Sequence, residues 1–141
     1  MSQLLQEIEA LRKPMKELND FIFDHPELGN EEFKAHELLT NLLEEEGFTV
    51  DREVSGLKTA FRAVYHVHGG GPKIGLLCEY DALEGLGHAC GHNLQGPSIC
   101  TAAIALKRTL QAPCTLVVYG TPAEETASGK LVMAREGVFD D

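Results

Sequence analysis

Residues 74–125 read IGLLCEYDALEGLGHACGHNLQGPSICTAAIALKRTLQAPCTLVVYGTPAEE, and this stretch decides the fold. The short apolar runs at residues 74–78 and 115–119 are typical of strands, and residues 97–110 between them have the length and spacing of a helix. A strand, a helix and a second strand in this order predict a crossover unit with two parallel strands. The sequence therefore predicts an α/β fold.

A polar motif follows each of these two predicted strands. Residues 87–93 read GHACGHN, and residues 121–125 read TPAEE. Functional residues of such folds gather beyond the carboxyl ends of parallel strands. The two motifs are therefore expected to meet at one site.

The residue types in these motifs suit a metal ion. Cys90 and His92 offer a thiolate and an imidazole one residue apart, and Glu124 and Glu125 offer a further ligand and a proton acceptor. A lone Cys-x-His pair is more often incidental, and paired glutamates are ordinarily a solvated surface. Their joint occurrence after two strands favours half of a metallohydrolase active site.

The rest of the chain is predicted from the same periodicities. Residues 4–22 repeat apolar side chains at helical spacing, with a disturbance at Pro14, and residues 25–30 form a turn. A second helix is predicted over residues 31–46 and ends at Gly47. Its expected buried side chains are Phe33, Leu38, Leu39, Leu42 and Leu43. Further strands are predicted at residues 49–53 and 60–68, and another helix near the carboxyl end.

The length and composition of the chain limit the classes of protein to which it can belong. The length of 141 residues fits one domain, and the net charge of −10 argues against a nucleic acid or an anionic membrane as partner. No signal peptide or membrane-spanning stretch is evident, so the cytoplasm is the expected location. In that compartment we expect reduced cysteines, with Cys78, Cys100 and Cys114 in the core.

The remaining histidines are interpreted mainly as structural. His25 and His36 are expected at the surface or as caps, and His66 and His68 as exposed residues of an edge strand. His88 flanks the predicted ligands, and a structural and a supporting role for it stay equally open. No second histidine completes a His-Glu-x-x-His motif, and neither a Gly-x-Ser-x-Gly nor a phosphate-binding glycine motif is present.

Four segments of the chain together resemble a known family. These are residues 24–33 (DHPELGNEEF), 78–83 (CEYDAL), 87–93 and 119–125. They are similar to the di-metal peptidase family of aminoacylase, hippurate hydrolase and aminobenzoyl-glutamate hydrolase, and the last branch is nearest. Members are considerably longer, with an inserted lid or dimerisation domain. The resemblance implies that residues 1–141 are the amino-terminal portion of a three-layer catalytic domain, with a mainly parallel sheet and flanking helices, incomplete at its carboxyl end.

The resemblance also implies a role for each site residue. The implied metal ligands are Cys90, His92 and Glu125. Glu124 would be the general base that takes a proton from metal-bound water, and Asp81 a supporting carboxylate. This division agrees with the chemistry, because a metal activates water and polarises an amide while an uncoordinated carboxylate handles the proton.

Three positions depart from the family's usual pattern. Asn93 stands where many relatives have aspartate, Glu84 where they have proline, and residues 126–128 where they have a glycine-rich run. Asn93 is expected to orient the loop or a ligand by hydrogen bonds. None of these departures removes an implied ligand.

The expected activity is hydrolysis of an amide bond in an N-acyl amino acid, an aminobenzoyl-glutamate-like compound or a dipeptide. The resemblance implies a homo-oligomeric parent enzyme with two divalent ions, zinc first and manganese or cobalt as alternatives. This chain alone would lack a complete site and be inactive. The alternative is a non-catalytic binding or regulatory partner of a full-length relative; a structural zinc module is disfavoured because the cysteines lack paired spacing.

Overall fold

Helices and strands follow one another in the predicted order, except that two helices occupy the range of the first predicted helix. The computed structural model describes residues 2–140. Its elements are α1 (Gln3–Ala10), α2 (Arg12–Asp24), α3 (Phe33–Glu45), β1 (Thr49–Arg52), the 3₁₀ helix η1 (Val54–Gly56), β2 (Phe61–Val67), β3 (Lys73–Cys78), α4 (His92–Thr109), β4 (Cys114–Gly120) and α5 (Gly129–Arg135). No helix in this part of the chain is long and apolar enough to cross a membrane.

The four strands form one sheet in the order β1-β2-β4-β3. Strands β3 and β4 are parallel and joined through α4, so the predicted crossover unit is confirmed. The β1–β2 and β2–β4 pairs are antiparallel, which makes the described sheet mixed rather than mainly parallel. The connections on either side of β2, residues 53–60 and 68–72, are shorter than the dozen or more residues that a parallel crossover needs.

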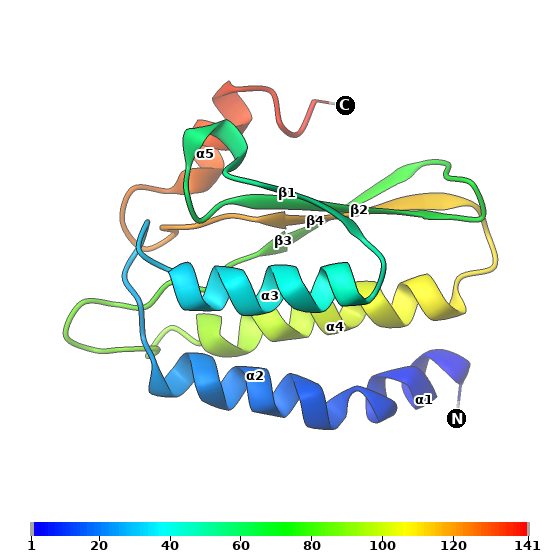
Figure 1. Ribbon diagram of the computed structural model, residues 1–141, viewed down its shortest axis with the longest axis horizontal. Coiled ribbons are helices and arrows are strands. Elements are labelled where there is room, and N and C mark those ends of the chain that lie inside the picture. The colour runs from blue at the N-terminus through cyan, green and yellow to red at the C-terminus, as the bar shows by residue number, and fades with distance from the viewer. Residues whose placement is uncertain (1, 141) are drawn as a thin grey trace.

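The sheet has helical layers on both faces (Figure 1). Helices α3 and α4 cover one face, and α1 and α2 pack against α4 from the outside. On the buried strand β4, Leu116 and Val118 belong to the core beneath these helices, while Val117 and Tyr119 pack with Met133 of α5 on the other face. The predicted α/β fold with flanking helices is therefore confirmed.

The first predicted helix is interrupted close to Pro14. Helix α1 ends at Ala10 and α2 begins at Arg12, which places Pro14 in the first turn of α2. A proline has no amide hydrogen to donate and its ring crowds the carbonyl four residues earlier, here that of Ala10. The helical pattern of residues 4–22 therefore forms two helices instead of one.

Helix α3 begins two residues later than predicted. The Glu27 carboxylate accepts hydrogen bonds from the amides of Lys34, at 2.9 Å, and Ala35, at 3.0 Å, at the start of the helix. These amides have no partner within a helix and need one from elsewhere. Glu32 lies just outside the helix and is fully buried.

The end of α3 agrees with the prediction. Gly47 has a left-handed backbone with φ of +85°, its amide donates to the Glu44 carbonyl at 2.8 Å, and the Phe48 amide donates to the Leu43 carbonyl at 2.9 Å. This is the Schellman arrangement, in which glycine avoids the strain that a side chain would cause.

The buried face of α3 is partly as predicted. Leu39 and Leu43 are fully buried, whereas the prediction for Phe33 was wrong because this residue at the helix start is 51% exposed. The surface expectation for His36 was also wrong: it is buried against the edge of the Phe61 ring, with a centroid separation of 5.9 Å. Burial lowers the pKa of His36, which favours the neutral imidazole in the core.

The other structural side chains mostly agree with expectation. Cys78, Cys100 and Cys114 are buried free thiols. His25 is an exposed residue at the end of α2, and His66 and His68 are exposed. The edge-strand assignment of these two was wrong: His66 is in β2, which lies between β1 and β4, and His68 follows the end of that strand.

Leu39 tests the packing of α3 on α4. Its Cδ1 atom would lie 3.2 Å from a Cβ added to Gly96 of α4, so the two helices are in close contact at this point. Leu39→Ala is expected to lower the free energy of unfolding by about 2–5 kcal/mol, since a cavity remains. Urea unfolding measures the change. Leu131→Ala, at a leucine that is 56% exposed, is the control and should change stability by less than about 0.5 kcal/mol; equal effects would contradict this packing.

Candidate metal centre

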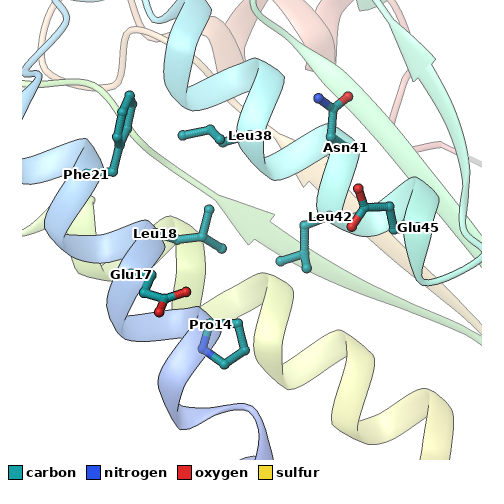
Figure 2. A pocket seen from close by; sticks show the side chains of 8 residues that line it. All are labelled: Pro14, Glu17, Leu18, Phe21, Leu38, Asn41, Leu42 and Glu45. Atoms are coloured by element: carbon teal, nitrogen blue, oxygen red, sulfur yellow. The ribbon is translucent and has the colours of Figure 1, made fainter.

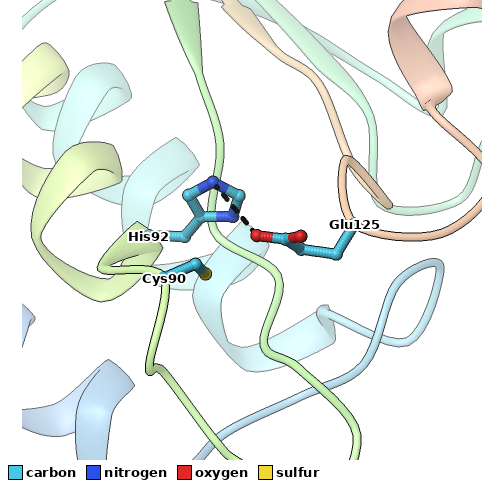
Figure 3. A group of neighbouring side chains, drawn as sticks. All are labelled: Cys90, His92 and Glu125. Carbon is cyan, nitrogen blue, oxygen red and sulfur yellow. Dashed lines mark ion pairs between the residues drawn. The ribbon is translucent and has the colours of Figure 1, made fainter.

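The loops after β3 and β4 meet at one edge of the sheet, as the sequence predicts. The Thr121 amide, directly after β4, donates to the Cys78 carbonyl at the end of β3 at 2.8 Å. Downstream of this contact the two chains carry the GHACGHN and TPAEE motifs. Figure 3 shows Cys90, His92 and Glu125 from these segments side by side.

The first motif leads directly into helix α4. Gly91 has φ of +91° and precedes His92, the first residue of the helix. The predicted helix start at residue 97 was therefore late by five residues, because glycine and proline usually interrupt a helix. Here Gly96 allows α4 to lie close to the segment after β3, since an added Cβ would lie only 3.1 Å from the Glu79 carbonyl oxygen. His92 and Asn93 therefore lie in the first turn of α4 and not in a loop.

Three potential ligands converge at this edge. One donor atom each from Cys90, His92 and Glu125 lies within 4.8 Å of the other two. The His92 Nε2 atom is 3.9 Å from Glu125 Oε1 (Figure 3). The sequence expectation that the two motifs bring these residues together is met by this geometry.

Asp81 ties the two halves of this group together. It is fully buried, accepts a hydrogen bond from His92 Nδ1 at 2.8 Å through Oδ1, and accepts one from the Glu125 amide at 2.9 Å through Oδ2. A carboxylate at Nδ1 fixes the proton there and leaves Nε2 to face Glu125. Asp81 therefore orients a side chain at the start of α4 and the backbone of the turn after β4.

These hydrogen bonds shift the pKa values of both partners. Burial by itself would raise the pKa of Asp81, but the bonds from His92 and the Glu125 amide outweigh burial and lower it. The bond to Asp81 raises the pKa of His92 against the opposing effect of burial. Asp81 thus remains ionised and available as an acceptor.

The TPAEE turn is held from its other side by Glu32. The Ala123 amide donates to Glu32 Oε1 at 2.7 Å, and the Thr59 hydroxyl donates to Glu32 Oε2 at 2.8 Å. Ala123 itself has φ of +55°, an uncommon backbone conformation that the surrounding contacts must maintain. Burial raises the pKa of Glu32. The sequence did not reveal Glu32, because an acidic pair at a predicted helix start normally indicates a solvated face.

A second group of donors overlaps the first. Glu79, His92 and Glu124 also have donor atoms within 4.8 Å of one another, and Glu79 Oε2 is 3.2 Å from His92 Nε2. Glu79 is only 8% exposed and was missed from the sequence. The sequence did contain an indication of Glu79: it lies two residues before Asp81, and alternate side chains of an extended segment are on the same side.

The two predicted supporting residues lie close by but face other elements. The Asn93 side-chain amide donates to Asn19 Oδ1 of α2 at 2.7 Å, which fixes the start of α4. His88 is buried, neither of its ring nitrogens has a hydrogen-bond partner among the described residues, and burial lowers its pKa. Contact of either residue with a ligand side chain stays a prediction.

A separate apolar groove lies between α2 and α3, away from this edge. Figure 2 shows Leu18 of α2 facing Leu38 and Leu42 of α3 across it, with Glu17 and Glu45 among the residues that line it. None of the donors named above lines this groove. Both donor groups found among residues 2–140 therefore lie at the sheet edge and outside this groove.

The first donor group fits a zinc-type ion. A thiolate, an imidazole nitrogen and a carboxylate are its preferred ligands, and three donors leave further coordination positions open. The bond from Nδ1 to Asp81 is the usual outer support of a ligating histidine. A donor set of this kind is the type that metal-dependent hydrolases use.

Comparison with known proteins agrees with this class. The chain is 45% identical to a p-aminobenzoyl-glutamate hydrolase chain of Escherichia coli over 95% of its length, and 38% identical to mouse Xaa-Arg dipeptidase over 96%. These matches cover 32% and 35% of the two relatives. The chain thus spans about a third of the length of the curated relatives it matches. No known family profile matches it.

Solved structures give the same result. The structure of Bacillus subtilis YXEP, described as a dinuclear metal binding peptidase from the M20 family, superposes with a TM-score of 0.84 and 28% identity. The match covers 94% of this chain and 41% of that protein. The resemblance seen in the sequence is confirmed: the homologues of this chain are hydrolases of the M20 metallopeptidase family.

Asp81→Asn tests the link between the two loops. Asparagine keeps the shape but has one acceptor oxygen in place of two, so either His92 or the Glu125 amide loses its acceptor, and Co²⁺ affinity is expected to fall about 10–100-fold. Equilibrium dialysis of the purified chain measures it. Asp51→Asn on β1, where the side chain is 64% exposed, should bind like wild type. Unchanged affinity in Asp81→Asn would contradict the role of Asp81.

Glu32→Ala tests the second anchor of the turn. It leaves the buried Ala123 amide without its partner and is expected to lower the free energy of unfolding by about 1–3 kcal/mol. Glu32→Gln retains an acceptor and a donor and should lose less. Urea unfolding of both variants gives the comparison, and equal losses would contradict the hydrogen-bonding role.

Wild type and Glu32→Gln should also differ in their pH dependence. Because the pKa of Glu32 is raised in the folded chain, its protonated form favours folding. This contribution is fully present below the unfolded-state pKa of about 4.3 and is lost as pH rises through the folded-state pKa. Wild type should therefore lose stability relative to Glu32→Gln over that range. A pH-independent difference would contradict the shift.

Proposed function

We propose that residues 1–141 form the amino-terminal portion of a metallopeptidase catalytic domain that hydrolyses amide bonds. The observation that carries the proposal is the convergence of Cys90, His92 and Glu125, with Glu124 beside them. The substrate class is an N-acyl amino acid, an aminobenzoyl-glutamate-like compound or a dipeptide. The names of the two relatives, a p-aminobenzoyl-glutamate hydrolase and an Xaa-Arg dipeptidase, support this range.

Cys90, His92 and Glu125 would hold the divalent ion in the proposed centre. Zinc fits this donor set, with manganese or cobalt as alternatives, and the dinuclear relative supports two ions in the complete protein. When bound, the ion would supply Lewis acidity toward an amide carbonyl and a water molecule. Asp81 would keep His92 in the tautomer with Nε2 toward the ion.

Glu124 would act as the proton acceptor. Its carboxylate lies within 4.8 Å of a ring nitrogen of His92 in the second donor group, and its side chain is 35% exposed. It is thus close to the ion-binding edge and accessible to a substrate. An uncoordinated carboxylate at this place can take a proton from water and pass it to the leaving amine.

A cavity of about 460 Å³ beside Glu125 offers room for part of the substrate. Apolar side chains of Leu28, Leu83 and Leu86 line it together with the carboxyl-bearing Glu31 and Glu84. Its size lies within the range of small-molecule sites. We place one of the two groups flanking the scissile amide here.

The cellular setting is part of the same proposal. The net charge of −10 supports a small-molecule substrate over a nucleic acid or an anionic membrane. We propose a cytoplasmic protein that assembles as a homo-oligomer when complete.

A second candidate is a non-catalytic partner of a full-length relative. Strand β3 lies at one end of the described sheet, and Ile74 and Leu77 on it are 41% and 43% exposed. An apolar edge strand can pair with another chain. Co-elution with a full-length relative in size-exclusion chromatography would support this function, and separate elution would remove it.

Metal binding tests the proposed centre directly. The purified chain is expected to bind Co²⁺ with the near-ultraviolet absorption of a thiolate ligand, and Cys90→Ser should lose that absorption and most of the affinity. Cys100→Ser, at a buried thiol outside the donor group, is the matched control. Retained absorption in Cys90→Ser would contradict the ligand assignment.

Amide hydrolysis tests the catalytic role. Because three donors do not complete a two-ion site, the zinc-loaded chain alone is expected to turn over p-aminobenzoyl-glutamate or an N-acyl amino acid at background rate. Amine release is the measurement. Turnover that disappears in Glu124→Gln would show instead that this chain alone contains a working site.

A further inference from the structure

The two donor groups compete for one histidine. Both the Cys90 group and the group of Glu79, His92 and Glu124 require a ring nitrogen of His92. Its Nδ1 atom is bonded to Asp81, so only Nε2 remains for an ion. Nε2 is closer to Glu79 Oε2, at 3.2 Å, than to Glu125 Oε1, at 3.9 Å. Some feature must therefore decide which group an ion occupies.

The ammonium group of Lys130 lies beside Glu79 and Glu124, two of the three donors of the second group. The Lys130 ammonium forms an ion pair with Glu79 Oε1, and it is 3.7 Å from Glu124 Oε1. The Lys130 side chain is only 27% exposed, so water screens these charges less than at the surface. The ammonium thus supplies a positive charge where a divalent ion would otherwise bridge the carboxylates.

The local backbone holds Lys130 at this place. The preceding Gly129 donates its amide to the Pro122 carbonyl at 2.9 Å, and a Cβ on Gly129 would lie only 2.4 Å from that oxygen. Absence of a side chain therefore lets the start of α5 lie against the turn that carries Glu124. The position of Lys130 follows from this contact.

Glu79 is held on its other side as well. Gln95 of α4 donates through Nε2 to Glu79 Oε2 at 3.0 Å, and accepts the Glu79 amide through Oε1 at 2.6 Å. With Lys130 on Oε1 and Gln95 on Oε2, both oxygens of Glu79 have partners within the protein. A metal ion would have to displace one of them.

We propose that Lys130 acts as a built-in cation that excludes metal from the Glu79–His92–Glu124 group. It thereby directs the ion to Cys90, His92 and Glu125, and leaves Glu124 without a metal bond. The exclusion of metal follows from the geometry alone; the benefit for catalysis rests on the proposed function, in which Glu124 must stay uncoordinated to accept a proton. Lys130 is a positioning residue in this scheme, because it acts through Glu79 and Glu124.

The test replaces Lys130 in a chain whose first donor group has already lost its thiolate through Cys90→Ser. Co²⁺ binding is measured by equilibrium dialysis with the full chain carrying Cys90→Ser, with and without Lys130→Met. Methionine keeps much of the length of the side chain and removes its charge. The added substitution is expected to tighten Co²⁺ binding by about tenfold or more, since a cation no longer opposes the ion. No thiolate absorption should accompany the gain.

Three further variants make the result specific. Adding Glu79→Gln to the double variant should abolish the gain, and Lys130→Arg, which keeps the charge, should give none. Arg135→Met removes the same charge from the exposed far end of α5 and should change affinity by less than about twofold. Circular dichroism confirms folding, with Lys130→Gln as the replacement if Lys130→Met is unfolded.

The outcomes separate this inference from the proposed function. Equal affinity with and without Lys130→Met, or a gain that survives Glu79→Gln, would overturn the role of Lys130. Failure of the proposed metal centre appears in a different comparison, as equal Co²⁺ affinity of wild type and Cys90→Ser. A gain from Lys130→Met in the Cys90→Ser chain would support the exclusion even then.

Discussion

The carboxylate of Asp81 is the interaction on which the site depends. It is fully buried and accepts hydrogen bonds from His92, on the first turn of α4, and from the Glu125 amide, in the turn after β4. Two residues that lie 11 and 44 positions away from Asp81 in the chain are therefore fixed to one carboxylate. Without this shared acceptor, the start of α4 would place the imidazole and the turn after β4 would place the glutamate, independently of one another. The parallel pairing of β3 and β4 brings these loops to one edge, and Asp81 sets their final geometry.

Several carboxylates lie close together at this edge. Glu79, Asp81, Glu124 and Glu125 lie near one imidazole, and Lys130 is the cation paired with two of them. Like charges at such distances repel unless a cation or hydrogen-bond donors lie between them. Asp81 is stabilised by donors and Glu79 by Lys130 and Gln95, whereas Glu124 and Glu125 keep oxygen atoms available. This difference is what separates a carboxylate that supports the site from one that can bind or react.

How much of the structure could be predicted from the sequence depended on how far apart in the chain the interacting residues are. The crossover unit, the stop at Gly47 and the convergence of Cys90, His92 and Glu125 were predictable, because they follow from local periodicity, one glycine and strand-end topology. The start of α4 was not, because the close approach of Gly96 to the Glu79 carbonyl is a tertiary contact. Glu32 and Lys130 were missed for the same reason: their partners lie 91 and 51 residues away in the chain. The sheet is mixed because the connections on either side of β2 are short. Which strands pair could not be predicted from the sequence, and the antiparallel pairs were therefore missed.

The most direct test of this account is a crystal structure of the zinc-loaded chain. We expect one ion bonded to Cys90 at about 2.3 Å and to His92 Nε2 at about 2.0–2.1 Å, with Glu125 as the oxygen ligand. The Asp81 bonds to His92 and to the Glu125 amide should be retained. An ion held by Glu79 and Glu124, or a His92 side chain that has left Asp81, would contradict the central claim.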